Sequence, residues 1–103
     1  MKQVPLKNVA IKLPNGKESL WDYKRQLIAI MEAPKDPKRG VDIGEVRQSI
    51  KVIEILEKAS GDFVEMEDAD YEYMMSKVSD AKFTFVNSAF IQFVDDMVSA
   101  GRE

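Results

Sequence analysis

Six acidic residues crowd the segment from 62 to 72, and carboxylates in this number could hold a metal ion. They are Asp62, Glu65, Glu67, Asp68, Asp70 and Glu72. A calcium loop of the EF-hand type needs glycine at its sixth position and a bidentate glutamate at its twelfth. Counted from Asp62, these positions hold Glu67 and Tyr73, so the pattern does not fit a calcium loop. We interpret the run as the acidic first turn of a helix, which the helix dipole favours; a surface that mimics the phosphates of DNA is the alternative.

Other groups that do chemistry are scarce. The chain contains no histidine and no cysteine, which excludes disulfides, thiolate nucleophiles, zinc fingers and histidine-based general bases. Asp95 and Asp96 are neighbours, and on a helix their side chains point about 100° apart, which does not suit an acid and base pair. No phosphate-binding loop of the type GxxxxGK[ST] or GxGxxG is present. The sequence therefore predicts a protein that is not an enzyme and that holds no cofactor and no metal ion.

The candidates for contact with a partner are aromatic and basic side chains. Trp21 is the only tryptophan and lies at the edge of an apolar stripe, and Tyr73 falls outside the inward stripe of its helix. Large rings with one polar end are typical of protein interfaces. A basic ridge on one helix, formed by Arg47, Lys51 and Lys58, is the third candidate. The alternatives are a place at the core boundary for each ring and a solvated helix face for the ridge.

The net charge of −3 is divided unevenly along the chain. Residues 1–58 hold twelve basic and eight acidic side chains, whereas residues 59–103 hold three and ten. Proteins that bind nucleic acid normally concentrate basic charge and have a high pI, but this sequence has a pI of about 5.0. A helix-turn-helix is also disfavoured, because the linker over residues 34–40 is long and contains two prolines. We therefore expect a protein partner, and nucleic acid is the weaker interpretation.

Local signals divide the chain into a short β element and four helices. Pro14-Asn15-Gly16 predicts a turn, Pro34 ends a helix, and Asp42 followed by Glu45 predicts a capping box at a helix start. We expect a strand or hairpin over residues 1–18 and helices over residues 19–33, 42–60, 67–80 and 87–100. The predicted fold is a single domain over residues 1–103, mainly α, with about four helices and a short N-terminal β-hairpin or strand.

The helix predicted over residues 42–60 is apolar on two sides. One stripe consists of Ile43, Val46, Ile50, Ile53 and Leu56, and a second consists of Val52, Ile55 and Ala59. A helix that is apolar over this much of its circumference must be covered on both sides. We therefore expect it to be the central helix of the domain or part of a subunit interface.

Three helical segments follow one another in the second half of the chain. They are EVRQSIKVIEILEKA (45–59), VEMEDADYEYMMSKV (64–78) and AFIQFVDDM (89–97). In this succession the chain resembles small, uncharacterised accessory proteins of tailed phages and prophages. The resemblance implies a short viral product that works by binding another macromolecule, and it assigns no functional residues.

We expect such a protein to act in virion assembly or in modulation of a host factor. Its partner would be a viral or host protein or a second copy of itself, and a small helical DNA-associated transcriptional regulator is the alternative. The expected location is the cytoplasm of an infected or lysogenic bacterial host, or the virion. No membrane partner is expected, because no apolar stretch is long enough to span a bilayer.

Overall fold

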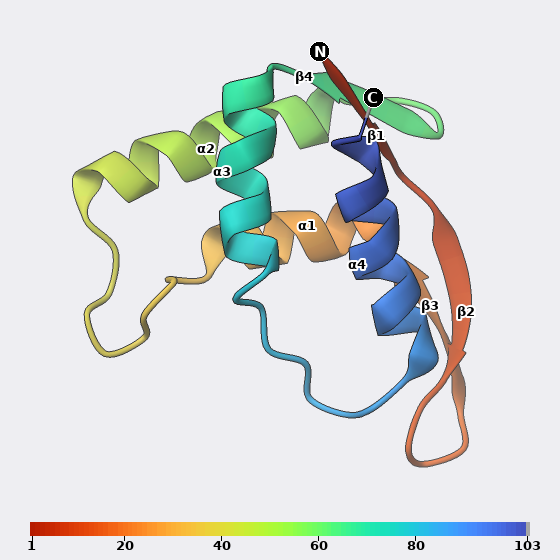
Figure 1. Ribbon diagram of the computed structural model, residues 1–103. Helices are drawn as coiled ribbons and strands as arrows, with labels where there is room; N and C mark the ends of the chain where they lie inside the picture. Colours follow the sequence, from red (N-terminus) through yellow and green to blue (C-terminus); the bar gives the residue numbers. More distant parts are fainter. Residues whose placement is uncertain (103) are drawn as a thin grey trace.

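The described part of the chain, residues 1–102, contains four strands and four helices in this computed structural model (Figure 1). The strands are β1 (Lys2–Pro5), β2 (Asn8–Lys12), β3 (Glu18–Asp22) and β4 (Phe63–Met66). The helices are α1 (Tyr23–Glu32), α2 (Ile43–Lys58), α3 (Asp68–Val78) and α4 (Ser88–Ala100). Strand β4 lies between α2 and α3 in the chain, and the other three strands precede α1.

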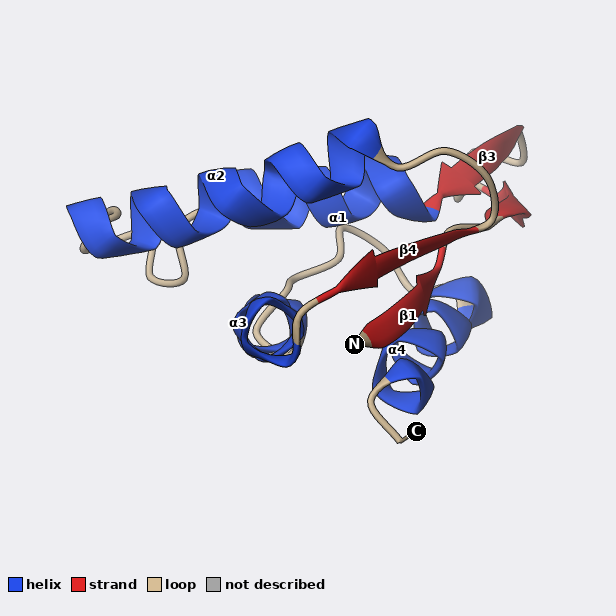
Figure 2. Ribbon diagram, turned by 90° about the horizontal axis from the view of Figure 1, so that it is seen from above, coloured by secondary structure: helices blue, strands red, loops and turns tan. Residues whose placement is uncertain are grey.

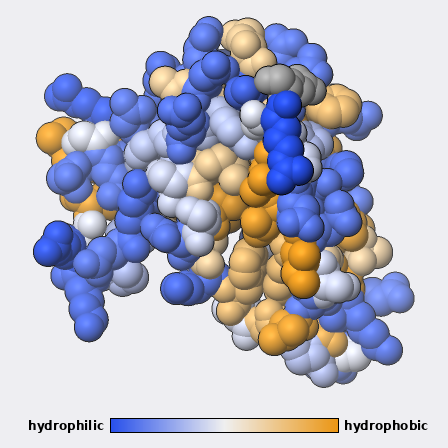
Figure 3. All heavy atoms as spheres, viewed as in Figure 1, coloured by the Kyte–Doolittle hydropathy of each residue, from blue (hydrophilic) through white to orange (hydrophobic). Residues whose placement is uncertain are grey.

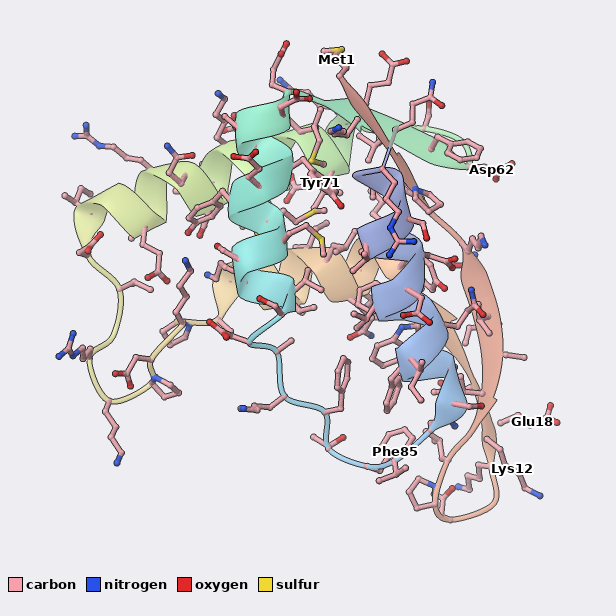
Figure 4. The ribbon with its side chains drawn as sticks, in the orientation of Figure 1. Met1, Lys12, Glu18, Asp62, Tyr71 and Phe85 are labelled. Atoms are coloured by element: carbon pink, nitrogen blue, oxygen red, sulfur yellow. The ribbon has the colours of Figure 1, made fainter. Side chains whose placement is uncertain are left out.

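The strands form two separate antiparallel sheets of two strands each. β2 and β3 make a hairpin, in which Lys12 and Glu18 lie opposite each other next to the turn (Figure 4). The turn depends on Gly16, whose φ of +87° is a conformation that glycine adopts without strain. β1 pairs with β4 instead and places Val4 opposite Val64. The hairpin is therefore local, whereas the second sheet joins segments that are far apart in the sequence.

The expectation of a mainly α domain is wrong, because the fold class is α+β with 49% helix and 20% strand. The helix predicted over residues 19–33 begins only at Tyr23, and residues 18–22 pair with β2. Asp22 caps α1 by accepting hydrogen bonds from two backbone N–H groups of the first turn. Residues 18–22 pair with β2 in the hairpin, so the helix starts only after them.

The other three helices lie close to the predicted positions. Asp42 caps α2 by accepting a hydrogen bond from the backbone N–H of Glu45 at 2.8 Å, which is half of the predicted capping box. Asn87 caps α4 by accepting one from the N–H of Ala89 at 2.9 Å. α3 ends at Val78 and is therefore shorter than the helix predicted over residues 67–80.

α1 and α2 run side by side in opposite directions, and α3 crosses both of them (Figure 1). The β1–β4 sheet lies between α2 and α4, and β1 packs against α4 (Figure 2). The largest fully buried apolar side chains lie where these elements meet: Val4, Tyr23, Leu27, Met31, Val52, Leu56, Met66, Met74, Val78, Phe93 and Met97. Burial of each large apolar side chain contributes about 1.5–3 kcal/mol. Apolar atoms also reach the surface between α3 and α4 and below them (Figure 3).

Lysines from neighbouring elements donate hydrogen bonds to carbonyls at the C-terminal ends of three helices. The Lys77 Nζ lies 2.9 Å from a carbonyl oxygen of α1, and the Lys24 Nζ lies 3.0 Å from the carbonyl oxygen that follows α2. The Lys2 Nζ lies 3.2 Å from the carbonyl oxygen that follows α4. α1 and α4 have no basic residue in their own last turns. The positive charge that the negative end of a helix dipole favours is therefore supplied by tertiary packing.

Tyr71 joins α3 to α4, and its side chain lies between the two helices (Figure 4). Its hydroxyl donates a hydrogen bond to the carbonyl of Met97. Burial raises the pKa of Tyr71, and the hydrogen bond with the backbone of Gly101 opposes the increase. A Cβ atom on Gly101 would lie 2.6 Å from the Tyr71 hydroxyl oxygen, so this helix end requires glycine for close approach.

Candidate functional site

Trp21 is half-buried in an aromatic cluster that joins β3 to α4. Its ring centroid lies 4.4 Å from that of Phe90 and 6.1 Å from that of Phe83. Phe83 stacks on Phe90 at 4.7 Å, and Phe85 contacts Phe90 edge-on at 5.1 Å. Phe83 and Phe85 belong to the segment 79–87, which has neither helix nor strand. The ring contacts therefore hold this irregular segment in place.

A continuous depression runs along one side of α1, and we call it the α1 trough. The segment 79–87 and the loop 33–42 flank the end of α3 there (Figure 1). A hollow of about 420 Å³ lies between these segments, and a smaller one of about 150 Å³ extends to Trp21. The residues that line both hollows are Gln26, Ile30, Ala81 and Lys82. The larger hollow is completed by Ala29, Ala33, Pro34, Lys35, Pro37, Lys77 and Asp80, and the smaller one by Trp21, Phe83, Thr84 and Phe90.

The α1 trough combines an apolar floor with an excess of positive charge. The floor is largely alanine, proline and isoleucine, and the charged residues of the lining are Lys35, Lys77, Lys82 and Asp80. Lys35 and Lys82 are exposed, and neither forms an ion pair within residues 1–102. A depression of this kind suits an occupant that has both apolar and acidic groups.

Lys77 lies at the inner end of the α1 trough with only 3% of its side chain exposed. Its Nζ donates a hydrogen bond to the carbonyl of Met31 at 2.9 Å and to the Ser49 Oγ at 3.4 Å. The same nitrogen lies 3.4 Å from a carboxylate oxygen of Glu45. Lys77 does not stand out in the sequence, because lysine is usually solvated. Its spacing was the available signal, since it lies three residues after Met74 on the inward face of α3.

Tyr73, a predicted contact residue, is half-buried and uses its hydroxyl inside the protein. The hydroxyl donates a hydrogen bond to the backbone carbonyl of Glu45 at 3.2 Å, so the Ser49 hydroxyl, 2.8 Å away, must donate to Tyr73. Burial raises the pKa of Tyr73, the hydrogen bond from Ser49 lowers it, and the carboxylates of Glu45 and Asp42 raise it. The Lys35 ammonium lies 5.4 Å from the ring centroid. Tyr73 therefore supports a lysine that lines the α1 trough.

The predicted basic ridge lies on α2, and Arg47, Lys51 and Lys58 are all exposed. The exposed acid Glu54 lies between Lys51 and Lys58 in the helix and interrupts the positive charge. Of the predicted contact residues, Trp21 alone lines the α1 trough. The structure therefore does not bring the ridge, the tryptophan and the tyrosine into one site.

Asp70, one of the acids expected in the first turn of a helix, is buried. It lies in the first turn of α3, as expected, but its side chain is only 2% exposed. One carboxylate oxygen lies 3.2 Å from the Lys51 Nζ, and the other has no hydrogen-bond partner within residues 1–102. Lys51 therefore serves at least in part as the counterion of a buried carboxylate.

A second polar cluster connects α1 to α4 through Tyr23 and Asp96. The Tyr23 hydroxyl donates a hydrogen bond to the carboxylate of Asp96 at 2.7 Å, and Gln92 and Lys7 donate to the same carboxylate at 2.9 and 3.3 Å. Burial raises the pKa of Tyr23, and the bonded carboxylate raises it further. Burial acts to raise the pKa of Asp96, but the three donors outweigh it and lower that pKa.

We expect Tyr23→Phe to lower the free energy of unfolding by about 1.5–3 kcal/mol at neutral pH, because a hydrogen bond to an ionised group is lost. The pKa of Asp96 is lowered in the folded state. Its contribution is therefore present above the unfolded pKa of about 3.9 and is lost as the pH falls through the folded pKa. Urea unfolding at neutral and acidic pH should show the difference between the two proteins shrinking in acid. An equal difference at every pH would contradict this pairing.

Within residues 1–102, no group of three or more acidic side chains is placed to hold a metal ion. No helix of the same residues is long and apolar enough to cross a membrane. No family model matches the chain, and neither a curated protein nor a solved structure matches it. Function must therefore be inferred from the α1 trough, the helix faces and the charges of the chain itself.

Proposed function

We propose that the protein is a non-enzymatic binding protein that acts by contact with another protein, and that the α1 trough holds a segment of this partner. The observation that carries the proposal is a continuous apolar depression with unpaired lysines at its rim. The resemblance to phage accessory proteins supports a viral or host partner. On that basis the role is virion assembly or modulation of a host factor, in the cytoplasm of an infected or lysogenic bacterial host or in the virion.

The length of α1 sets the size of the extended segment that the trough would hold. α1 has ten residues, which span about 15 Å at 1.5 Å per residue. An extended chain rises about 3.3 Å per residue, so roughly five residues would lie along this length. Apolar side chains would fill the floor, and an aromatic or aliphatic one would reach Trp21 at the far end. Acidic side chains of the segment would pair with Lys35 and Lys82.

DNA binding, the alternative function, has less support from the geometry. Duplex recognition depends on a continuous basic surface that neutralises phosphates. On α2 the acid Glu54 interrupts the basic ridge, and Lys51 is paired with Asp70. A gel shift with duplex DNA at low salt would test it directly, and binding that weakens with salt would favour the regulator.

A random peptide library displayed on beads would test the proposed function. We expect the selected peptides to combine apolar residues with Asp or Glu, and to change the fluorescence of Trp21, the only tryptophan. Reversing both rim charges with Lys35→Glu and Lys82→Glu should weaken binding of these peptides about tenfold or more. The double variant Lys12→Glu and Lys17→Glu is the matched control, because it changes the net charge equally on the hairpin, where both lysines are exposed.

Two outcomes would contradict the proposal. The first is that no peptide is selected above background. The second is that selected peptides bind the rim variant and the hairpin variant equally well, which would place their contact elsewhere.

A further inference from the structure

The outward side of α2 carries apolar side chains that no other element of residues 1–102 covers. Ile43 is 67% exposed and Ile50 is 49% exposed, and Val41, just before the helix, is 46% exposed. The half-buried Val46 and Ile53 border them. Figure 2 shows that α2 forms one long edge of the molecule. This side of the helix is therefore open to a partner of similar length.

The apolar positions have the spacing of a seam between two helices. Positions 43, 46, 50 and 53 alternate steps of three and four residues, which brings a continuous apolar line to one side of a helix. The chain itself covers the opposite side of α2, where Val52 and Leu56 are fully buried. We expected this helix to be covered on two sides, and residues 1–102 cover one of them.

The charges beside this seam indicate which partner fits. Arg47 and Glu54 lie at equal distances on either side of the midpoint between residues 50 and 51. Both are exposed, and neither forms an ion pair within residues 1–102. An antiparallel pair of α2 helices around a two-fold axis at this midpoint brings Arg47 of each copy opposite Glu54 of the other. A parallel pair would bring Arg47 opposite Arg47. The charges at positions 47 and 54 are therefore complementary to each other in the antiparallel arrangement.

We propose that two copies of this chain associate through their α2 helices, antiparallel around a two-fold axis near Ile50, with reciprocal ion pairs between Arg47 and Glu54. Ile50 of each copy packs against Ile50 of the other beside the axis, and Ile43 lies opposite Lys58 of the other copy. α2 has sixteen residues and is about 24 Å long. Contact through one helix pair is smaller than the ~1,600 Å² of a standard interface, so the dimer should be weak. The lining of the α1 trough contains no residue of α2, so the dimer leaves the trough open.

Sedimentation equilibrium between about 10 µM and 1 mM would test the dimer. We expect the wild-type chain to dimerise in this range and each of the single variants Arg47→Glu and Glu54→Arg to dimerise about tenfold less strongly or worse, because like charges then face each other. The double variant should recover dimerisation. An equimolar mixture of the two single variants should form a heterodimer, since one copy then carries two acids and the other two arginines.

The reciprocal behaviour of these variants separates the proposed contact from any other self-association. Lys12→Glu and Glu18→Lys, at paired exposed positions of the hairpin, are the matched charge reversals and should leave the dimer unchanged. Circular dichroism confirms that each variant is folded. A wild-type chain that stays monomeric at 1 mM would overturn the proposal, and so would a dimer that both single variants retain at wild-type strength. Neither result bears on the α1 trough, which the peptide selection tests separately.

Discussion

Phe93→Ala is expected to lower the free energy of unfolding by about 3–5 kcal/mol, because a fully buried aromatic side chain is removed and a cavity remains. The Phe93 ring contacts Tyr23 edge-on at 4.8 Å and Trp21 at 6.0 Å, so α4 would lose one contact with the hairpin and one with α1. Small domains are stable by only about 5–15 kcal/mol. Urea unfolding followed by circular dichroism would measure the loss without relying on Trp21 fluorescence, which the substitution itself would alter.

Ile91→Ala is the matched control for this substitution. It removes an apolar side chain from the same helix, but Ile91 is 66% exposed, so its removal should change the free energy of unfolding by no more than about 0.5 kcal/mol. If Phe93→Ala lowered the free energy of unfolding no more than Ile91→Ala does, the contact between α4 and the β3–α1 junction would not contribute to stability.

The starts of α2 and α4 were predictable from sequence because their causes are local. Asp42 and Asn87 each accept a hydrogen bond from an N–H group within three residues, so donor and acceptor are close together in the sequence. The β1–β4 sheet has no such local cause. Val4 and Val64 become partners only when the chain between them has folded, and a four-residue strand carries little periodicity of its own. The fold class was therefore mistaken because of the strands.

The boundary between the hairpin and α1 shows how two local signals can compete. Ser19 and Asp22 both have the side chain of a helix cap, and residues from 20 onward repeat at helical spacing. The turn at Gly16 decides between them, because it returns the chain along β2 and commits residues 18–22 to the hairpin. Only Asp22 is then free to cap the helix.

The α1 trough could not be predicted, because its walls come from segments without regular structure. One wall is the segment 79–87, whose position depends on stacking of Phe83 on Phe90. Trp21, which lines the trough, can be recognised from the sequence, since it is a lone tryptophan at the edge of an apolar stripe. The burial of Lys77 and Asp70 cannot, because burial of a charged residue depends on partners from other helices.

Lys77→Ala is expected to lower the free energy of unfolding by about 3–5 kcal/mol, the range for removing one partner of a buried ion pair. The substitution leaves the carbonyl of Met31 without its donor and the carboxylate of Glu45 without its counterion. It also removes the only side chain that links α1, α2 and α3 at one nitrogen among the hydrogen bonds of residues 1–102. Urea unfolding at neutral pH, followed by circular dichroism, would measure the effect.

Two further substitutions separate the charge of Lys77 from its bulk. Lys77→Met keeps the apolar stem, so it should be less destabilising than alanine, and the difference reports packing. The double variant Lys77→Met and Glu45→Gln should lower the free energy of unfolding by less than the sum of the two single changes, because residues that contact each other are energetically coupled by about 0.5–3 kcal/mol.

Lys82→Ala, at an exposed lysine of the trough rim, is the control and should change the free energy of unfolding by no more than about 0.5 kcal/mol. Equal effects of alanine at positions 77 and 82 would show that the buried ammonium does not hold the three helices together.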